Sequence, residues 1–213
     1  MSVGRDDVER WIRSFAEAIA ENKDYLTALD SEIGDADHGI NMNRGMTAVV
    51  QKLDASSDDD IAGTFKTVGM TLVSSVGGAG GPLYGTLFLQ FGLSVAAKQT
   101  LELADWAQMV GAGVEGVRGR GKAELGDKTM LDALAPARDA LDAAVGQGLA
   151  FGDALSSAAA AAEGGMMATI PLVARKGRAS YLGERSAGHQ DPGATSSWML
   201  MRTAAETLAD VEA

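Results

Sequence analysis

The chain has 213 residues, of which 46% are hydrophobic and 22% are charged, the proportions of an ordinary soluble globular protein. Its formal net charge of −11 argues against nucleic acid and against an anionic membrane surface as partners, because binding to either depends on a basic face. The absence of cysteine excludes a disulfide framework and a thiolate zinc site.

The N-terminal residues form no apolar signal core, and no apolar run reaches the ~18 residues that a membrane helix requires. We therefore expect a cytoplasmic protein. The length fits one good-sized domain or two small ones. Because the only linker-like composition is short, at residues 55–60, we expect a single domain over residues 1–213.

Apolar residues recur at helical spacing along most of the chain, beginning with the stripe Val8, Trp11, Ile12, Phe15 and Ile19. Helices are predicted, in chain order, at residues 8–23, 41–53, 61–76, 83–98, 101–118, 129–145, 153–174 and 196–212. We expect a kink at Pro136 in the sixth and a bend at Gly164–Gly165 in the seventh. No segment alternates over strand length, so an all-α bundle of about eight amphipathic helices is the predicted fold.

Residues 29–45, which run from the connection after the first helix into the second, read LDSEIGDADHGINMNRG and contain four acids in close succession: Asp30, Glu32, Asp35 and Asp37. Carboxylates beside a tight glycine turn suit a hard divalent cation such as Mg²⁺ or Ca²⁺. The alternative is a solvated acidic loop that caps a helix. The segment is not an EF-hand, because counting from Asp35 puts Gly39 and Met46 at the fifth-position ligand and the closing glutamate.

Gly39 and Asn41 mark the expected start of the second helix. A helix N-terminus presents free amide groups and the positive end of its dipole, which together make an anion site. A cation site and an anion site are therefore adjacent in the sequence. This pairing suits a complex of a metal ion with a polyphosphate.

A second glycine-rich turn, SVGGAGGPLYGT, spans residues 75–86. It is not a P-loop, because no lysine follows the glycines. It leads into a helix at Pro82, and it permits either a close approach of phosphate to the backbone or a flexible connection between helices. GAGVEG, at residues 111–116, has the spacing of a dinucleotide fingerprint but follows a predicted helix, so close helix packing explains its glycines better.

Residues 175–195, RKGRASYLGERSAGHQDPGAT, show no apolar period and are basic in an otherwise acidic chain. Structureless connections longer than ~12–15 residues are uncommon in compact domains, so we expect a lid or a binding loop here. His189 lies in this loop and His38 lies in the acidic stretch. Each histidine suits either a metal or acid–base role, or a loop histidine that only forms hydrogen bonds.

These motifs together resemble one family. GDADHG closely resembles the GDGDHG signature of the nucleotide-binding L subunit of dihydroxyacetone kinases, the DhaL family. GGAGGPLYGT resembles GGASGPLYGT, and both GDKTMLDAL and KGRASYLGERSAGHQDPGATS are nearly unchanged from the family pattern. The resemblance spans essentially the whole chain.

The resemblance implies a closed barrel of eight antiparallel amphipathic helices, with the nucleotide among the loops at one end. It implies that Asp30, Asp35 and Asp37 hold two Mg²⁺ ions. Arg178 would reach the phosphates from the long loop and stabilise the charge that develops during transfer. The other nucleotide contacts carried over by position are His38, Gly39, Ile40, Asn41, Ala79, Gly80, Gly121, Met130, Asp191, Pro192 and Gly193.

The family's activity follows from the same resemblance. One form of these kinases uses ATP and has both parts in one chain. In the split form, the L subunit keeps ADP bound, accepts phosphate from a phosphohistidine on the M subunit of the phosphoenolpyruvate-fed phosphotransferase system, and passes it to dihydroxyacetone on a K subunit. This chain carries only the nucleotide part, so we expect the split form. The alternatives are an ATP-dependent ketotriose kinase subunit that exchanges nucleotide, a nucleotide-sensing protein that contacts a regulator, and a metal-dependent phosphohydrolase.

Two residues depart from the family pattern. Ala36 stands where glycine is usual, and its β-carbon is harmless if φ is negative but costs ~1 kcal/mol if φ is positive. Gly80 stands where serine is usual, so only a backbone contact to phosphate is expected there. Glu32 has no counterpart among the implied metal ligands, and we expect it to be solvated.

Overall fold

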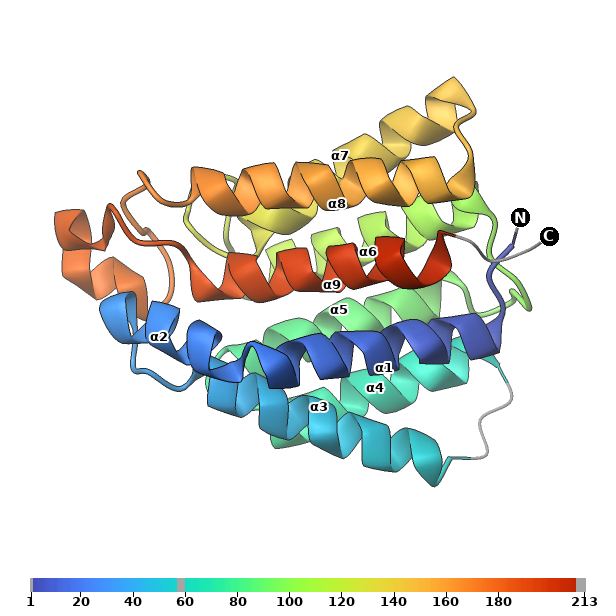
Figure 1. Ribbon diagram of the computed structural model, residues 1–213, viewed down its shortest axis with the longest axis horizontal. Coiled ribbons are helices and arrows are strands. Elements are labelled where there is room, and N and C mark those ends of the chain that lie inside the picture. Colours follow the sequence, from blue (N-terminus) through green and yellow to red (C-terminus); the bar gives the residue numbers. More distant parts are fainter. Residues whose placement is uncertain (1, 57–59, 210–213) are drawn as a thin grey trace.

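The computed structural model describes residues 2–56 and 60–209. Within them, nine α-helices and one 3₁₀ helix follow one another along the chain (Figure 1). They are α1 (Arg5–Glu21), α2 (Lys23–Ile33), α3 (His38–Asp54), α4 (Ile61–Ser75), α5 (Gly80–Ser94), α6 (Leu103–Gly121), α7 (Leu131–Gln147), α8 (Phe151–Ala168), the 3₁₀ helix η1 (Arg178–Ser186) and α9 (Pro192–Leu208).

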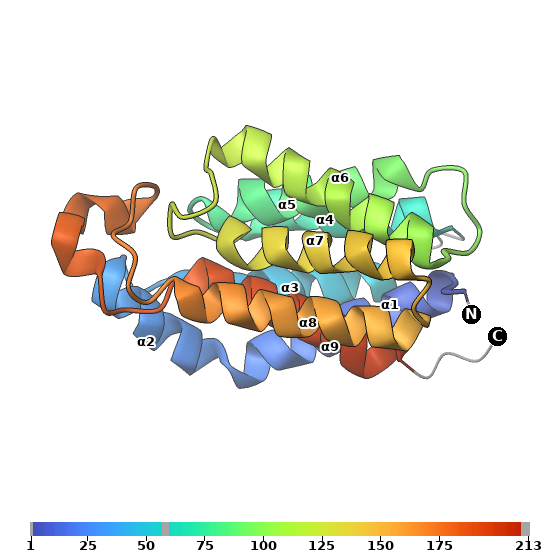
Figure 2. The same ribbon diagram turned by 90° about the horizontal axis from the view of Figure 1, so that it is seen from above.

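Eight of these helices form a closed ring. From α1 to α3 and then in order to α9, each packs on the next, and α9 packs back on α1. Successive members run in opposite directions (Figures 1 and 2). The predicted all-α antiparallel barrel is therefore confirmed. Helix α2 extends the ring at one end, where it packs on α3, α9 and η1.

Aromatic side chains fill the middle of the ring. Trp11 is fully buried, with its ring centroid 5.0 Å from that of Trp106 and 6.3 Å from that of Phe65. Its Nε1 donates a hydrogen bond of 3.0 Å to the carbonyl of Leu200, which ties α1 to α9 where the ring closes. Complete burial of a large apolar side chain contributes roughly 1.5–3 kcal/mol, so these buried aromatic side chains supply much of the stability of the closed ring.

Backbone pairing of the β type is limited to one short contact among the described residues. Val3 and Leu101 form an isolated antiparallel bridge, with N–O distances of 2.9 and 2.8 Å, and the described residues contain no other β pairing. Over the same residues, none of the helices combines the length and the apolar character needed to span a bilayer.

Some predicted boundaries were wrong. Helix α2 was not expected at all, and the loop expected at residues 175–195 contains η1. α3, α5 and α9 begin three or four residues earlier than predicted. α8 stops at Ala168 instead of 174, because Pro171 disfavours helical backbone just before it. The predicted end of the last helix, at 212, lies outside the described residues.

The positions at which a kink and a bend were expected both lie inside continuous helices. α7 runs through Pro136 as one helix, and α8 runs through Gly164–Gly165. A β-carbon at Gly165 would lie 2.0 Å from the carbonyl oxygen of Asp132, so this glycine lets α8 approach α7 closely.

Every second connection lies at the same end of the ring, because consecutive helices alternate in direction (Figure 1). That end receives the α2–α3, α4–α5 and α6–α7 connections and the long segment between α8 and α9. These four connections contain GDADHG, GGAGGP, GDKTM and the basic loop. The topology therefore brings together every motif on which the resemblance rests.

Close helix packing accounts for several of the ring's glycines. A β-carbon at Gly69 in α4 would lie 2.9 Å from the carbonyl oxygen of Gly85 in α5. Within GAGVEG, a β-carbon at Gly113 would lie 2.3 Å from the ring of Phe91, which supports the packing interpretation of that motif. Gly111 differs from Gly113 in the same motif, because a β-carbon at Gly111 would meet nothing within 4 Å.

We predict opposite effects for alanine at two of these positions. Gly69→Ala should lower the free energy of unfolding by roughly 1–3 kcal/mol, because the added methyl overpacks the α4–α5 contact. Gly111→Ala should raise it by up to ~1 kcal/mol, because alanine is the better helix former and meets no neighbour. Urea denaturation followed by circular dichroism measures both, and equal effects would contradict this account of the packing.

Candidate functional site

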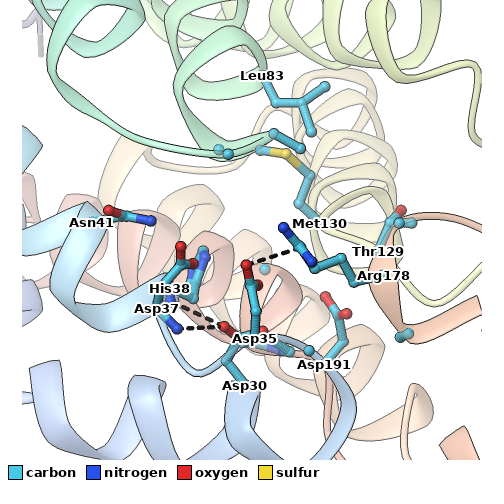
Figure 3. A pocket seen from close by; sticks show the side chains of 18 of the residues that line it. Asp30, Asp35, Asp37, His38, Asn41, Leu83, Thr129, Met130, Arg178 and Asp191 are labelled. Carbon is cyan, nitrogen blue, oxygen red and sulfur yellow. Dashed lines mark hydrogen bonds and ion pairs between the residues drawn. The ribbon is translucent and has the colours of Figure 1, made fainter. Parts of the chain in front are cut away.

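The four connections at this end surround one pocket (Figure 3). Its floor is the acidic turn between α2 and α3. The glycine turn before α5, together with Thr129 and Met130, lines its sides, and Arg178 of the basic loop reaches the carboxylates. The first turn of α9, Asp191–Gly193, completes the lining.

Three carboxylates gather on the floor of the pocket. One oxygen from each of Asp30, Asp35 and Asp37 lies within 4.8 Å of the others. Asp30 is buried, Asp35 is exposed, and Asp37 is intermediate. Carboxylates at this spacing repel one another in a partly desolvated site, so the arrangement favours binding of a cation.

Backbone contacts hold Asp30 in this cluster. It occupies the last turn of α2, and its Oδ2 accepts hydrogen bonds from the amides of Asp37, at 2.8 Å, and His38, at 3.1 Å. These amides belong to the start of α3, so the same carboxylate stabilises that helix end. Oδ1 of Asp30 takes no part in these two bonds and remains a candidate ligand atom.

The turn that carries Asp35 is tight. A β-carbon at Gly34 would lie 2.0 Å from Oδ1 of Asp30, so this position requires glycine. Ala36 has φ of 59°, in the left-handed region that side chains disfavour. Because φ is positive at Ala36, the β-carbon of this alanine carries the expected cost of ~1 kcal/mol.

The residues present fit a divalent cation such as Mg²⁺. The ligand set is entirely carboxylate oxygen, which hard cations prefer. A positive group already lies against it, since Nε of Arg178 is 2.9 Å from Oδ2 of Asp35. Glu32 points to another neighbour, with Oε2 3.7 Å from Nδ1 of His189, and is not part of the carboxylate group.

The glycine turn before α5 forms a backbone wall. Gly78 has φ of 62°, and a β-carbon at Gly77 would lie 3.0 Å from the side-chain amide of Asn41. α5 begins at Gly80 without a side-chain cap, so its first amides face the pocket as an anion site. A β-carbon at Gly80 would meet only Val76, at 3.3 Å.

His38 and Tyr84 share a buried hydrogen-bond chain behind this wall. Nε2 of His38 lies 2.8 Å from Oγ of Ser196, which lies 2.7 Å from the hydroxyl of Tyr84. Burial lowers the pKa of His38, with Asp30 and Asp37 opposing the shift, and burial raises the pKa of Tyr84 to about 12. Both shifts favour the neutral forms of the two rings.

Asp191 caps α9 at the back of the pocket. Its Oδ2 accepts from the amide of Ala194 at 2.7 Å, and its own amide donates to Oγ1 of Thr169 at 3.1 Å. Burial raises the pKa of Asp191 to about 7, against the lowering effect of the Ala194 hydrogen bond. A nearby cation would favour the ionised form of this carboxyl group.

Most of the predicted site residues line this pocket, whereas Gly39, Ile40 and Gly121 do not. A β-carbon at Gly39 would lie 2.0 Å from the carbonyl oxygen of Lys23, so this glycine allows α3 to pack on α2. Ile40 is 50% exposed. Gly121 sits behind the pocket wall, where a β-carbon would lie 3.3 Å from Leu83.

Sequence reasoning missed several lining residues, among them Gly77, Gly78, Leu83, Tyr84, Lys128, Thr129 and Lys176. The motifs GGAGGPLYGT and GDKTM contain most of them and were the available signal. Of these, Lys128 is the least expected, because lysine is almost never fully buried without compensation.

Ala36→Gly should stabilise the protein. Glycine relieves the cost of a β-carbon at positive φ, while the extra freedom of the unfolded chain offsets part of the gain, so we expect a net increase of ~0.5–1 kcal/mol in the free energy of unfolding. Chemical denaturation without divalent cations measures it, with Ala55→Gly as a control at a residue of negative φ. A loss of stability in Ala36→Gly as large as in the control would contradict the assigned strain.

Comparison with known proteins places this geometry in a family. The DAK2 domain matches residues 32–206. The PEP-dependent dihydroxyacetone kinase ADP-binding subunit DhaL of Escherichia coli K12 is 50% identical over 202 residues, covering 95% of this chain and 96% of that one. The PTS-dependent dihydroxyacetone kinase ADP-binding subunit DhaL of Lactococcus lactis is 43% identical, covering 96% and 98% of the two chains.

The fold has a solved counterpart. The crystal structure of the dihydroxyacetone kinase of C. freundii matches with a TM-score of 0.73 at 25% sequence identity. The match covers 93% of this chain and 34% of that longer one. From the domain match and the two relatives, this chain belongs to the DAK2-domain family and, within it, to the DhaL subunits.

Proposed function

We propose that this chain is the ADP-binding, phosphoryl-transferring subunit of a cytoplasmic dihydroxyacetone kinase that takes its phosphate from phosphoenolpyruvate through the phosphotransferase system. The observation that carries the proposal is the pocket, which is lined both by three carboxylates and by Ala79 and Gly80 at the N-terminus of α5. A cation site beside an anion-binding helix end suits a nucleotide polyphosphate with its metal. The names of the DhaL relatives supply the substrate and the donor.

In this proposal Asp30, Asp35 and Asp37 hold two Mg²⁺ ions, and ADP stays tightly bound between turnovers. The bound nucleotide and its ions supply the acceptor for the phosphoryl group and neutralise its charge. The chain fixes the geometry. The backbone turn at Ala79–Gly80, with His38 and Asn41 of α3, orients the phosphates, while Met130 supports the adenosine side.

Arg178 is the residue that we assign to the transition state. Its side chain is 66% exposed on the loop that covers the pocket, and it is paired with Asp35 through Nε. An exposed ion pair of this kind is worth at most ~1 kcal/mol, so the guanidinium is easily redirected. Turned towards the phosphates, it would stabilise the charge that develops on the transferred group.

Among the described residues that line the pocket, His38 is the only histidine. Its Nε2 is engaged with Oγ of Ser196, so this ring nitrogen is not free to accept a phosphoryl group. This favours direct transfer to and from the nucleotide. The partners in the proposal are an M subunit that donates from phosphohistidine and a K subunit that holds dihydroxyacetone.

Reconstitution with labelled phosphoenolpyruvate tests the proposal. Wild-type protein, mixed with the phosphotransferase proteins and a K subunit, should move label to dihydroxyacetone. Asp35→Asn should reduce the rate by about 100-fold or more, because it removes one charge from the metal site. Glu32→Gln, an exposed acid outside the carboxylate group, is the matched control and should keep the wild-type rate.

Circular dichroism of each variant checks that the helices are intact. Equal turnover with ATP and the K subunit alone would show an ATP-dependent kinase and contradict the assigned donor. Release of inorganic phosphate without an acceptor would show a phosphohydrolase. A wild-type rate in Asp35→Asn would remove that residue from the metal site.

A further inference from the structure

Lys128 has a position that the proposed reaction does not use. It lies between α6 and α7 with only 1% of its surface exposed and with φ of 64°. A buried lysine and a strained backbone at one residue are both unfavourable, so the surrounding structure must compensate for them.

Carbonyl oxygens from two separate parts of the chain surround its ammonium group. Nζ donates to the carbonyls of Thr169, at 2.8 Å, and Leu172, at 3.1 Å, with that of Ile170 at 3.4 Å. It also donates to the carbonyl of His189. The three protons of an ammonium group therefore find acceptors on both sides of the long segment between α8 and α9.

These carbonyl groups belong to the two ends of that segment. We call these two ends, residues 169–172 and 188–191, the neck. The neck is also joined directly, by the amide of Gly188 to the carbonyl of Ile170 at 2.8 Å and the amide of Asp191 to Oγ1 of Thr169 at 3.1 Å. Arg178 lies within the segment, and Asp191 begins the turn that closes the back of the pocket.

Burial and nearby charge act on this ammonium group in opposite directions. Burial lowers the pKa of Lys128, while the carboxylates of Asp191 and Asp132 oppose that shift. If the ammonium were removed, the converging carbonyl dipoles would lose their shared donor, and buried acceptors without a donor are costly. The two direct hydrogen bonds between the ends of the neck would remain.

We propose that Lys128 is a positioning residue, whose ammonium group clamps the neck and thereby holds the loop with Arg178 and the Asp191–Gly193 turn over the pocket. The inference rests on the proposed nucleotide site only for its effect on ADP binding. The clamp itself is a property of the chain alone, and the two can be tested separately.

The chain has no cysteine, so Lys128→Cys introduces a single thiol. Alkylation of the unfolded variant with 2-bromoethylamine restores an ammonium group at nearly the length of lysine. Alkylation with 1-bromopropane places a methyl group where that ammonium would be. After refolding, the two adducts differ in charge and hydrogen bonding but scarcely in size. Lys66→Cys, at an exposed position in α4, receives the same two adducts as the matched control.

An arginine-specific protease, used without nucleotide, reports on the loop, because Arg175 and Arg178 are exposed in it. We expect the propyl adduct at 128 to be cleaved there about 10-fold faster than the aminoethyl adduct, which should match the wild type. Affinity for ADP with Mg²⁺, measured by calorimetry, should fall about 10-fold in the propyl adduct and recover in the aminoethyl adduct. The two adducts at position 66 should behave alike.

Equal cleavage of the two adducts at 128 would overturn the clamp. A propyl adduct without helical circular dichroism would also overturn it, because Lys128 would then hold the ring and not the neck. Faster cleavage with unchanged ADP affinity would confirm the clamp but contradict its role in the pocket. Failure of wild-type protein to bind ADP would count against the proposed function and leave the cleavage result standing.

Discussion

Mutual repulsion among Asp30, Asp35 and Asp37 is the constraint around which this end of the molecule is arranged. Their oxygens lie within 4.8 Å of one another. Asp30 is held by two backbone amides at the start of α3, and the turn between them is closed by a glycine that admits no β-carbon and by an alanine with positive φ. Such a concentration of charge and backbone strain is expected where a site binds a cation.

The ring of helices supplies the setting. Because consecutive helices run in opposite directions, four of the connections meet at the same end of the ring. Each connection adds one part: carboxylates from α2–α3, a glycine backbone from α4–α5, Lys128 to Met130 from α6–α7, and a basic loop from α8–α9. The core beneath, centred on Trp11, fixes where these connections emerge.

The sequence predicted the ring helices well because their apolar faces keep the helical period, as the buried stripe of α1 shows. It failed where functional polar residues occupy inward positions. In α2 the buried positions are Leu26, Asp30 and Ile33, so an aspartate interrupts the stripe and the helix was missed. Buried Thr195 similarly interrupts the apolar pattern in the first turn of α9, which was missed. The motif GDKTM contains Lys128, but the contacts of its ammonium group could not be predicted, because its acceptors are backbone carbonyls brought together only by the fold.

The measurement that tests the central claim most directly is the binding of ADP to nucleotide-free protein, by titration calorimetry with Mg²⁺ and with a chelator. If the carboxylates hold ions that bridge to the phosphates, metal and nucleotide strengthen each other's binding. Chelation should then weaken ADP affinity by about 100-fold. Equal ADP affinity with and without Mg²⁺ would contradict the account, because the carboxylates would then have no part in holding the nucleotide.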